Sequence, residues 1–86
     1  MQKNTKNNRY KYDVGNTVYI IMNDKNIIQV TIEKRLKRPH RLSDNFYYCS
    51  WDFNGYQKYG IRYEKEMFPT YSEALNAFIE QNVVSL

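Results

Sequence analysis

The 86-residue sequence contains a single cysteine, Cys49, and a single histidine, His40. A lone cysteine cannot form an internal disulfide, so the fold does not depend on an oxidising compartment. A metal site needs several converging ligands, and one histidine with one cysteine cannot supply them from those two residue types. We therefore expect no disulfide, no metal and no cofactor.

Long apolar runs are also missing. No apolar stretch reaches the ~18 residues that a membrane-spanning helix requires. Residues 1–12 are polar and basic and lack the apolar stretch of a signal peptide. Glycine and proline are too scarce for a low-complexity chain. These absences predict one soluble domain in the cytoplasm, with no membrane partner.

Patterns for catalysis are absent as well. The sequence has no glycine-rich phosphate loop and no serine–histidine–aspartate order. Cys49 as a nucleophile would need an activating neighbour such as His40, whereas a cysteine within a strand is more often a small packing residue. His40 is either a base or phosphate contact or, more simply, an exposed loop residue. We expect no catalytic residue and no enzyme.

Positive charge is concentrated in two segments. Residues 1–11 hold four basic residues and residues 34–41 hold five, whereas the whole chain has a net charge of only +4, so the rest carries −5. Clustering of this kind attracts an anionic partner. The alternative for residues 34–41 is a solvated loop that keeps the protein soluble, and the two interpretations are equally open.

Four segments have strand character and a fifth is shorter. The first segment is rich in β-branched residues, the second alternates apolar and polar residues, and a polar turn separates them. The next two segments are aromatic and flank Asn54-Gly55, the strongest short hairpin signal. The segments are Thr17–Met22, Ile28–Glu33, Phe46–Phe53, Tyr56–Glu64 and the short Glu66–Phe68. The polar stretch from Leu36 to Asn45, which contains Pro39, is predicted to be a loop.

A helix is predicted near the C-terminus. Thr70 and Glu73 have the spacing of a capping box, and apolar residues follow at helical spacing to about residue 82. The predicted fold class is α+β: a small, strongly curved antiparallel sheet or barrel of four to five strands with one C-terminal helix at about 71–82. Residues 1–11 are predicted to be a mobile basic arm and residues 12–86 a single small-barrel-like domain.

A two-residue turn at Asn54-Gly55 fixes the register of the aromatic hairpin. Phe53 then lies opposite Tyr56, and the same face carries Tyr47, Cys49, Trp51, Lys58, Gly60 and Arg62. The other face carries Phe46, Tyr48, Ser50, Tyr59, Ile61 and Tyr63. We predict the second set to be core and the first to be an open face with cation–π pairs, unless the helix covers it.

The run Val14-Gly15-Asn16-Thr17-Val18-Tyr19 followed by a hairpin resembles the opening of small-barrel modules of the Src-homology-3, KOW and Tudor type. The C-terminal run from Tyr63 to Leu75 resembles that of short phage and mobile-element proteins. The resemblance implies a module that recruits peptides, proteins or nucleic acid. Phages use short basic proteins of this size to block host enzymes and defence complexes, including CRISPR effectors.

Two functions follow as hypotheses. The first is a phage or mobile-element inhibitor, of the anti-CRISPR or another anti-defence type, that binds a host protein or a protein–nucleic acid complex and binds free nucleic acid only weakly. The alternative is a KOW- or Tudor-like module that binds nucleic acid directly. In either case the expected partner-binding residues are Lys34, Arg35, Lys37, Arg38, His40, Arg41, Tyr47, Trp51, Lys58 and Arg62.

Overall fold

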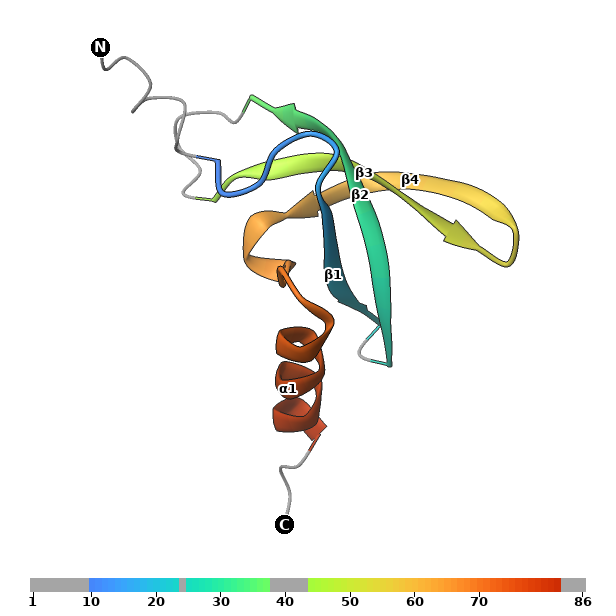
Figure 1. Cartoon of the computed structure of the whole chain (residues 1–86), viewed down its shortest axis with the longest axis vertical. Helices are drawn as coiled ribbons and strands as arrows, with labels where there is room; N and C mark the ends of the chain where they lie inside the picture. Colours follow the sequence, from blue (N-terminus) through green and yellow to red (C-terminus); the bar gives the residue numbers. More distant parts are fainter. Residues whose placement is uncertain (1–9, 24, 38–43, 83–86) are drawn as a thin grey trace.

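A four-stranded antiparallel sheet and one C-terminal helix make up the fold (Figure 1). The computed structural model describes residues 10–23, 25–37 and 44–82. The strands lie in the order β1-β2-β3-β4. Their bounds are β1 Thr17–Met22, β2 Asn26–Leu36, β3 Phe46–Phe53 and β4 Tyr56–Tyr63, followed by the 3₁₀ turn η2 Glu64–Glu66 and the helix α1 Tyr71–Asn82.

The predicted α+β class is confirmed. The described residues do not close into a barrel, because β1 and β4 stand at opposite ends of the strand order. The expected fifth strand is reduced to one bridge. Glu66 ends the 3₁₀ turn, and only Phe68 pairs with an existing strand, at Tyr19 of β1. Within the described ranges, no helix has the length and apolarity needed to cross a bilayer.

A bulge bends the longest strand, β2. The register of β2 against β3 shifts between Ile32 and Lys34, which leaves Glu33 as an extra residue. Bulges of this kind bend a strand and increase its twist. The Ser50 hydroxyl lies 2.5 Å from a Glu33 carboxylate oxygen and donates a hydrogen bond to it. Accordingly, the β1–β2 hairpin and the β3–β4 hairpin extend in different directions in Figure 1.

The core lies on the inner face of this bent sheet. Alternate residues of β1, β2 and β3 point to it, together with residues that precede β1 and follow η2. The buried cluster consists of Tyr12, Val18, Ile20, Val30, Ile32, Tyr47, Cys49 and Met67. Apolar side chains of this size each contribute about 1.5–3 kcal/mol when fully buried, so this cluster is the main source of stability.

The first described residues are part of the domain. The Tyr10 ring packs edge-on against Tyr47, with ring centroids 5.8 Å apart, and the Tyr10 hydroxyl donates to the Leu36 carbonyl at 2.6 Å. The Lys11 amide donates to the Glu64 carboxylate at 2.8 Å. The expectation of a mobile arm as far as residue 11 is therefore wrong for its last two residues, and residues 1–9 lie outside the described ranges.

The helix begins and ends where the sequence predicts. The Thr70 hydroxyl accepts a hydrogen bond from the Glu73 amide at 3.1 Å, which is the N-cap contact expected from the spacing. The helix packs on β1 and β2. Its Tyr71 ring lies 5.9 Å from that of Tyr19, a residue that alternates with buried Val18 and Ile20. The helix therefore covers the side of β1 opposite the core.

The turn between β3 and β4 supports a stability prediction. Asn54 and Gly55 both have positive φ, 53° and 85°, as a two-residue turn requires. Gly55→Val places a β-branched side chain in a region it avoids, so we expect a loss of at least ~1 kcal/mol in urea titration. Gln57→Val, at an exposed strand position, is the control and should change stability by less than about 0.5 kcal/mol. Equal effects of the two changes would contradict the assignment.

Candidate binding surface

The aromatic hairpin has the predicted register and the opposite orientation. Phe53 pairs with Tyr56, Trp51 with Lys58, and Tyr47 with Arg62, as the turn length predicts. However, Tyr47 and Cys49 are fully buried, whereas Tyr59 and Ile61 are 54% and 50% exposed. The face expected to be core is the outer surface, except at Ser50, which is buried and bonds Glu33. Tyr47 therefore cannot contact a partner in the folded domain, and this prediction is wrong.

The reason lies in distant segments that cover the inner face. Tyr10 and Tyr12 come from before β1 and Met67 from after η2, and all three pack around Tyr47 or the cluster that contains it. No pattern within the hairpin itself reports these contacts. Both faces of the hairpin are rich in aromatic residues, so composition alone could not distinguish them.

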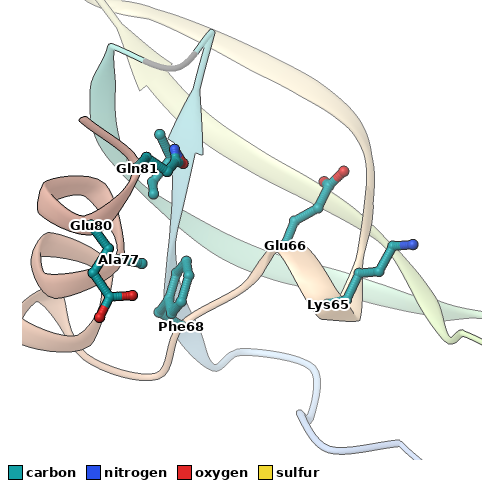
Figure 2. A pocket seen from close by; sticks show the side chains of 7 residues that line it. Lys65, Glu66, Phe68, Ala77, Glu80 and Gln81 are labelled. Carbon is teal, nitrogen blue, oxygen red and sulfur yellow. The ribbon is translucent and has the colours of Figure 1, made fainter. Parts of the chain in front are cut away.

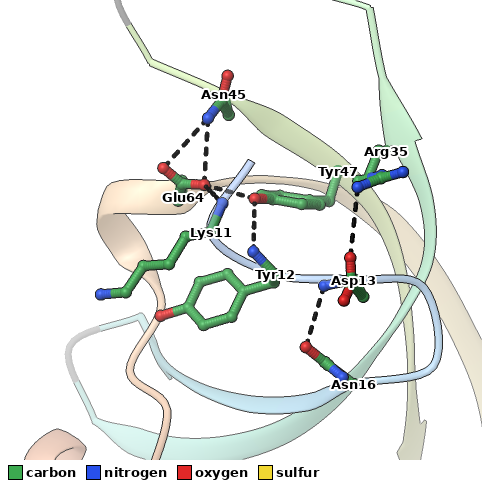
Figure 3. A network of polar contacts seen from close by, with 8 residues as sticks. All are labelled: Lys11, Tyr12, Asp13, Asn16, Arg35, Asn45, Tyr47 and Glu64. Carbon is green, nitrogen blue, oxygen red and sulfur yellow. Dashed lines mark hydrogen bonds and ion pairs between the residues drawn. The ribbon is translucent and has the colours of Figure 1, made fainter. Parts of the chain in front are cut away.

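Tyr47 is at the centre of a polar network (Figure 3). Its hydroxyl donates to the Glu64 carboxylate at 2.5 Å and accepts from the Tyr12 amide at 3.3 Å. The Asn45 side-chain amide donates to the same carboxylate at 3.2 Å. Burial, together with the bond to Glu64, raises the pKa of Tyr47. Burial also acts to raise the pKa of Glu64, but the hydrogen bonds from Tyr47, Lys11 and Asn45 outweigh it and hold that pKa below its ordinary value.

The outer aromatic face is the surface formed by Phe46, Tyr48, Tyr59, Ile61 and Tyr63. Tyr48 and Tyr59 stack across the strands, with centroids 5.7 Å apart and planes at 13°. Phe46 and Tyr63 form a tilted pair at 5.6 Å. Tyr48 and Tyr63 are 37% and 38% exposed. Rings that stack on one another and still face solvent form a platform for a further planar group.

Basic residues of β2 border this face. Lys34 is exposed and lies opposite Tyr48 in the β2–β3 register, and Lys37 is exposed just beyond the end of β2. Arg35 has partners of its own, because it forms an ion pair with Asp13 at 3.3 Å and its guanidinium lies 5.2 Å from the Tyr10 ring centroid. Arg38, His40 and Arg41 lie outside the described residues, so their expected role remains a prediction.

The two basic segments of the sequence join the domain at neighbouring points. The hydrogen bond between Tyr10 and Leu36 connects the end of residues 1–11 to the segment 34–41. Leu36 is also opposite Phe46, and Phe46 is opposite Tyr63, so this junction is level with one end of the outer aromatic face. We call the described cations here, Lys11, Lys34, Arg35 and Lys37, the basic pole.

Trp51, Lys58 and Arg62 are on the inner face, beyond the buried cluster. The Arg62 guanidinium lies 5.4 Å from the Trp51 ring centroid, and the Lys58 ammonium lies 5.8 Å from that of Phe53. Neither cation–π contact is between residues directly opposite in the β3–β4 register. Trp51 and Lys58 line an open groove of about 340 Å³, together with Met22, Asn23, Asn26, Ile28 and Phe53.

A second groove runs between α1 and β1 (Figure 2). Its volume is about 490 Å³, and its apolar floor comes from Ile21, Phe68 and Ala77. Lys65, Glu66 and Glu80 line it as well, and in Figure 2 they do not converge on a common point. This mixture of charges favours no class of ligand.

Catalytic chemistry finds little support at Cys49. Burial raises the pKa of its thiol to about 11, so the thiol is protonated at neutral pH. A protonated, buried thiol is a poor nucleophile. Among the residues that the structure describes, no group of three or more histidine, cysteine or carboxylate side chains could hold a metal ion. The interpretation of Cys49 as a packing residue agrees with its position in the core.

No protein-family model, no curated protein and no solved structure matches this chain.

Proposed function

We propose that this chain is a non-enzymatic binding protein with an open, bent antiparallel sheet, and that it binds single-stranded nucleic acid through the outer aromatic face and the basic pole. The observation that carries the proposal is the stacked, exposed pair Tyr48–Tyr59 beside Lys34. Stacking on aromatic rings contributes about 1–3 kcal/mol per base in single-strand binding proteins. Lysines at the border of such a face are placed to meet the phosphates.

The order of features along the face supports a strand rather than a duplex. Aromatic pairs lie at two levels of the hairpin. Phe46–Tyr63 is level with Leu36, where the basic segments join, and Tyr48–Tyr59 is level with Lys34. Bases can reach such rings only when they are unpaired. The basic segments join at one end, so the phosphate chain would enter at the basic pole and its bases would follow the rings. Glu33 and Asp52 lie toward the other end, which limits the contact to a few nucleotides.

A second candidate function is binding of a host protein, or of a protein–nucleic acid complex, by a phage-type inhibitor in the host cytoplasm. The groove beside Trp51 favours it, because Met22, Ile28 and Phe53 offer an apolar surface and Lys58 a charge at its border. Tryptophan in a groove is a common anchor of protein interfaces. This candidate uses the inner face, so mutations distinguish it from the first.

The test is fluorescence anisotropy with labelled 12-nucleotide oligo-dT and oligo-U. The wild type should bind either probe, and Tyr48→Ser/Tyr59→Ser should weaken binding at least tenfold because two stacking surfaces are lost. The log–log slope of affinity against salt should be about −3 to −5. Tyr56→Ser, which removes a 71% exposed tyrosine outside the outer aromatic face, is the matched control and should bind like the wild type.

The outcomes separate the two candidates. No binding of either oligonucleotide, or equal binding by wild type and the double variant, would overturn the nucleic-acid proposal. Loss of binding to a host complex on Trp51→Ala, with Tyr48→Ser/Tyr59→Ser unaffected, would instead favour the protein-binding candidate. Circular dichroism of each variant should be unchanged, since Tyr48 and Tyr59 lie outside the buried cluster.

A further inference from the structure

The last strand of the sheet, β4, has one edge without a partner among the described residues. It stands at the end of the strand order and pairs with β3 along all eight of its residues. Sheet edges are usually protected by proline, a bulge or a covering segment, because unpaired backbone groups attract another strand. β4 contains no proline, and its pairing with β3 shows no register shift.

The strand β4 also carries exposed apolar and aromatic side chains. Tyr59 and Ile61 on its outer side are each about half exposed, and Tyr63 is 38% exposed. A neighbouring strand would cover the flank of these side chains and pair with the backbone groups of this edge. The Tyr63 amide already donates to the Glu66 carboxylate at 3.3 Å and would exchange that bond for one to the new strand. Nucleic acid on the outer aromatic face would use the rings but leave the backbone edge open, so the edge points to a protein strand.

We propose that β4 pairs antiparallel with β4 of a second copy of this chain, with Ile61 of each copy at the two-fold axis. The two sheets then form one continuous sheet, and the outer aromatic faces of the two copies become continuous. The interface is isologous: each copy contributes the same strand and the contacts are repeated about the axis.

The charges on β4 select this register. In a symmetric antiparallel pair, opposite residues share a face, so the axis passes through one residue of the strand. An axis at Gly60 would put Lys58 of each copy opposite Arg62 of the other, and like charges directly opposite are destabilising. An axis at Ile61 instead puts Arg62 opposite Gly60, which carries no side chain.

The apolar side chains agree with the axis at Ile61. That register places Ile61 opposite its own copy and Tyr59 opposite Tyr63, so each outer-face pair is apolar or aromatic, a favourable kind of cross-strand pair. An axis at Tyr59 would put Gln57 opposite Ile61 and Tyr56 opposite Arg62, which mixes polar with apolar partners. Both charge and side-chain type therefore favour Ile61.

Disulfide trapping tests the register directly. Opposite Cα atoms in an antiparallel pair are about 4.5–5.5 Å apart, within the range of a disulfide. Ile61→Cys should form a covalent dimer under mild oxidation at micromolar concentration. Tyr59→Cys should not, because the two introduced cysteines would be four residues out of register, roughly 13 Å apart. The native Cys49 is buried and stays out of the reaction.

Sedimentation equilibrium of the unmodified chain gives an independent result. The wild type should be a dimer at about 100 μM, and Ile61→Lys should be a monomer of unchanged circular dichroism, because two lysines would meet at the axis. Efficient trapping of Tyr59→Cys instead of Ile61→Cys, or a wild type that is monomeric at 100 μM, would overturn the proposal. The proposed nucleic-acid function does not depend on either outcome, since the oligonucleotide assay does not require a dimer.

Discussion

Tyr47→Ala is expected to destabilise the domain by about 3–5 kcal/mol, the cost typical of removing a buried aromatic ring. Tyr47 is fully buried, contacts the rings of Tyr10 and Tyr12, and bonds Glu64. Domains of this length have total stabilities of about 4–13 kcal/mol, and small domains stand near the lower limit. A large fraction of the variant should therefore be unfolded at 25 °C, as measured by urea titration followed by circular dichroism.

Two further variants serve as controls for Tyr47→Ala. Tyr56→Ala removes a tyrosine that is 71% exposed and should cost less than about 0.5 kcal/mol. Tyr47→Phe keeps the ring and removes only the hydroxyl, so it should cost about 1.5–3 kcal/mol, the value for a hydrogen bond to a charged group. A Tyr47→Ala variant as stable as Tyr56→Ala would contradict the buried position of Tyr47.

Removing the Glu64 carboxylate is expected to have the next largest effect. It accepts hydrogen bonds from the Tyr47 hydroxyl, the Lys11 amide and the Asn45 side chain. Glu64→Leu removes this acceptor from the buried Tyr47 hydroxyl, which costs about 1–3 kcal/mol, and also removes the bonds from Lys11 and Asn45. We expect a loss of about 2–4 kcal/mol in urea titration at pH 7. Glu80→Leu, at an exposed helix position, is the control and should be nearly neutral.

The same network predicts the pH range of greatest stability. The pKa of Glu64 is lower in the folded state than in the unfolded chain, so its contribution is present above its ordinary pKa of about 4.3 and is lost as the pH falls through the folded value. The pKa of Tyr47 is raised, so its contribution is present below about 10 and is lost at higher pH. The melting temperature of Glu64→Leu should therefore fall less than that of the wild type below pH 5. If the melting temperatures of the two proteins fall by the same amount below pH 5, Glu64 has no role in acid stability.

Local patterns were sufficient for the two hairpins and the helix. They did not give the ends of β2, predicted as Ile28–Glu33 and observed as Asn26–Leu36, nor the reduction of the fifth strand to a single bridge. The Asn54-Gly55 turn fixes the register of Phe53 with Tyr56, and the Thr70–Glu73 spacing marks the start of α1, because both signals depend on residues adjacent in the chain. The alternation of Ile28, Val30 and Ile32 likewise marks one face of β2, and Val30 and Ile32 are buried.

The orientation of the aromatic hairpin could not be predicted in this way. It depends on Tyr10 and Tyr12, which are more than thirty residues from Tyr47 in the chain, and on Met67. The polar and basic composition of residues 1–11 predicts a mobile arm, and this pattern gives no sign that the Tyr10 ring covers a face of the sheet. Since both faces of the hairpin are aromatic, a small difference in coverage decides which is buried. The exposed aromatic residues at the centre of the hairpin are therefore Tyr48 and Tyr59, whereas Tyr47 is buried.

Chemical labelling of the single buried thiol, Cys49, can report how often the folded domain opens. A reagent that modifies thiols can reach Cys49 only when β3 separates from the residues packed around it, because the side chain is fully buried. When reclosing is faster than modification, the labelling rate equals the equilibrium fraction of open molecules multiplied by the intrinsic rate of the free thiol. The free energy of opening can thus be measured in plain buffer, without denaturant, at a single chemically unique atom.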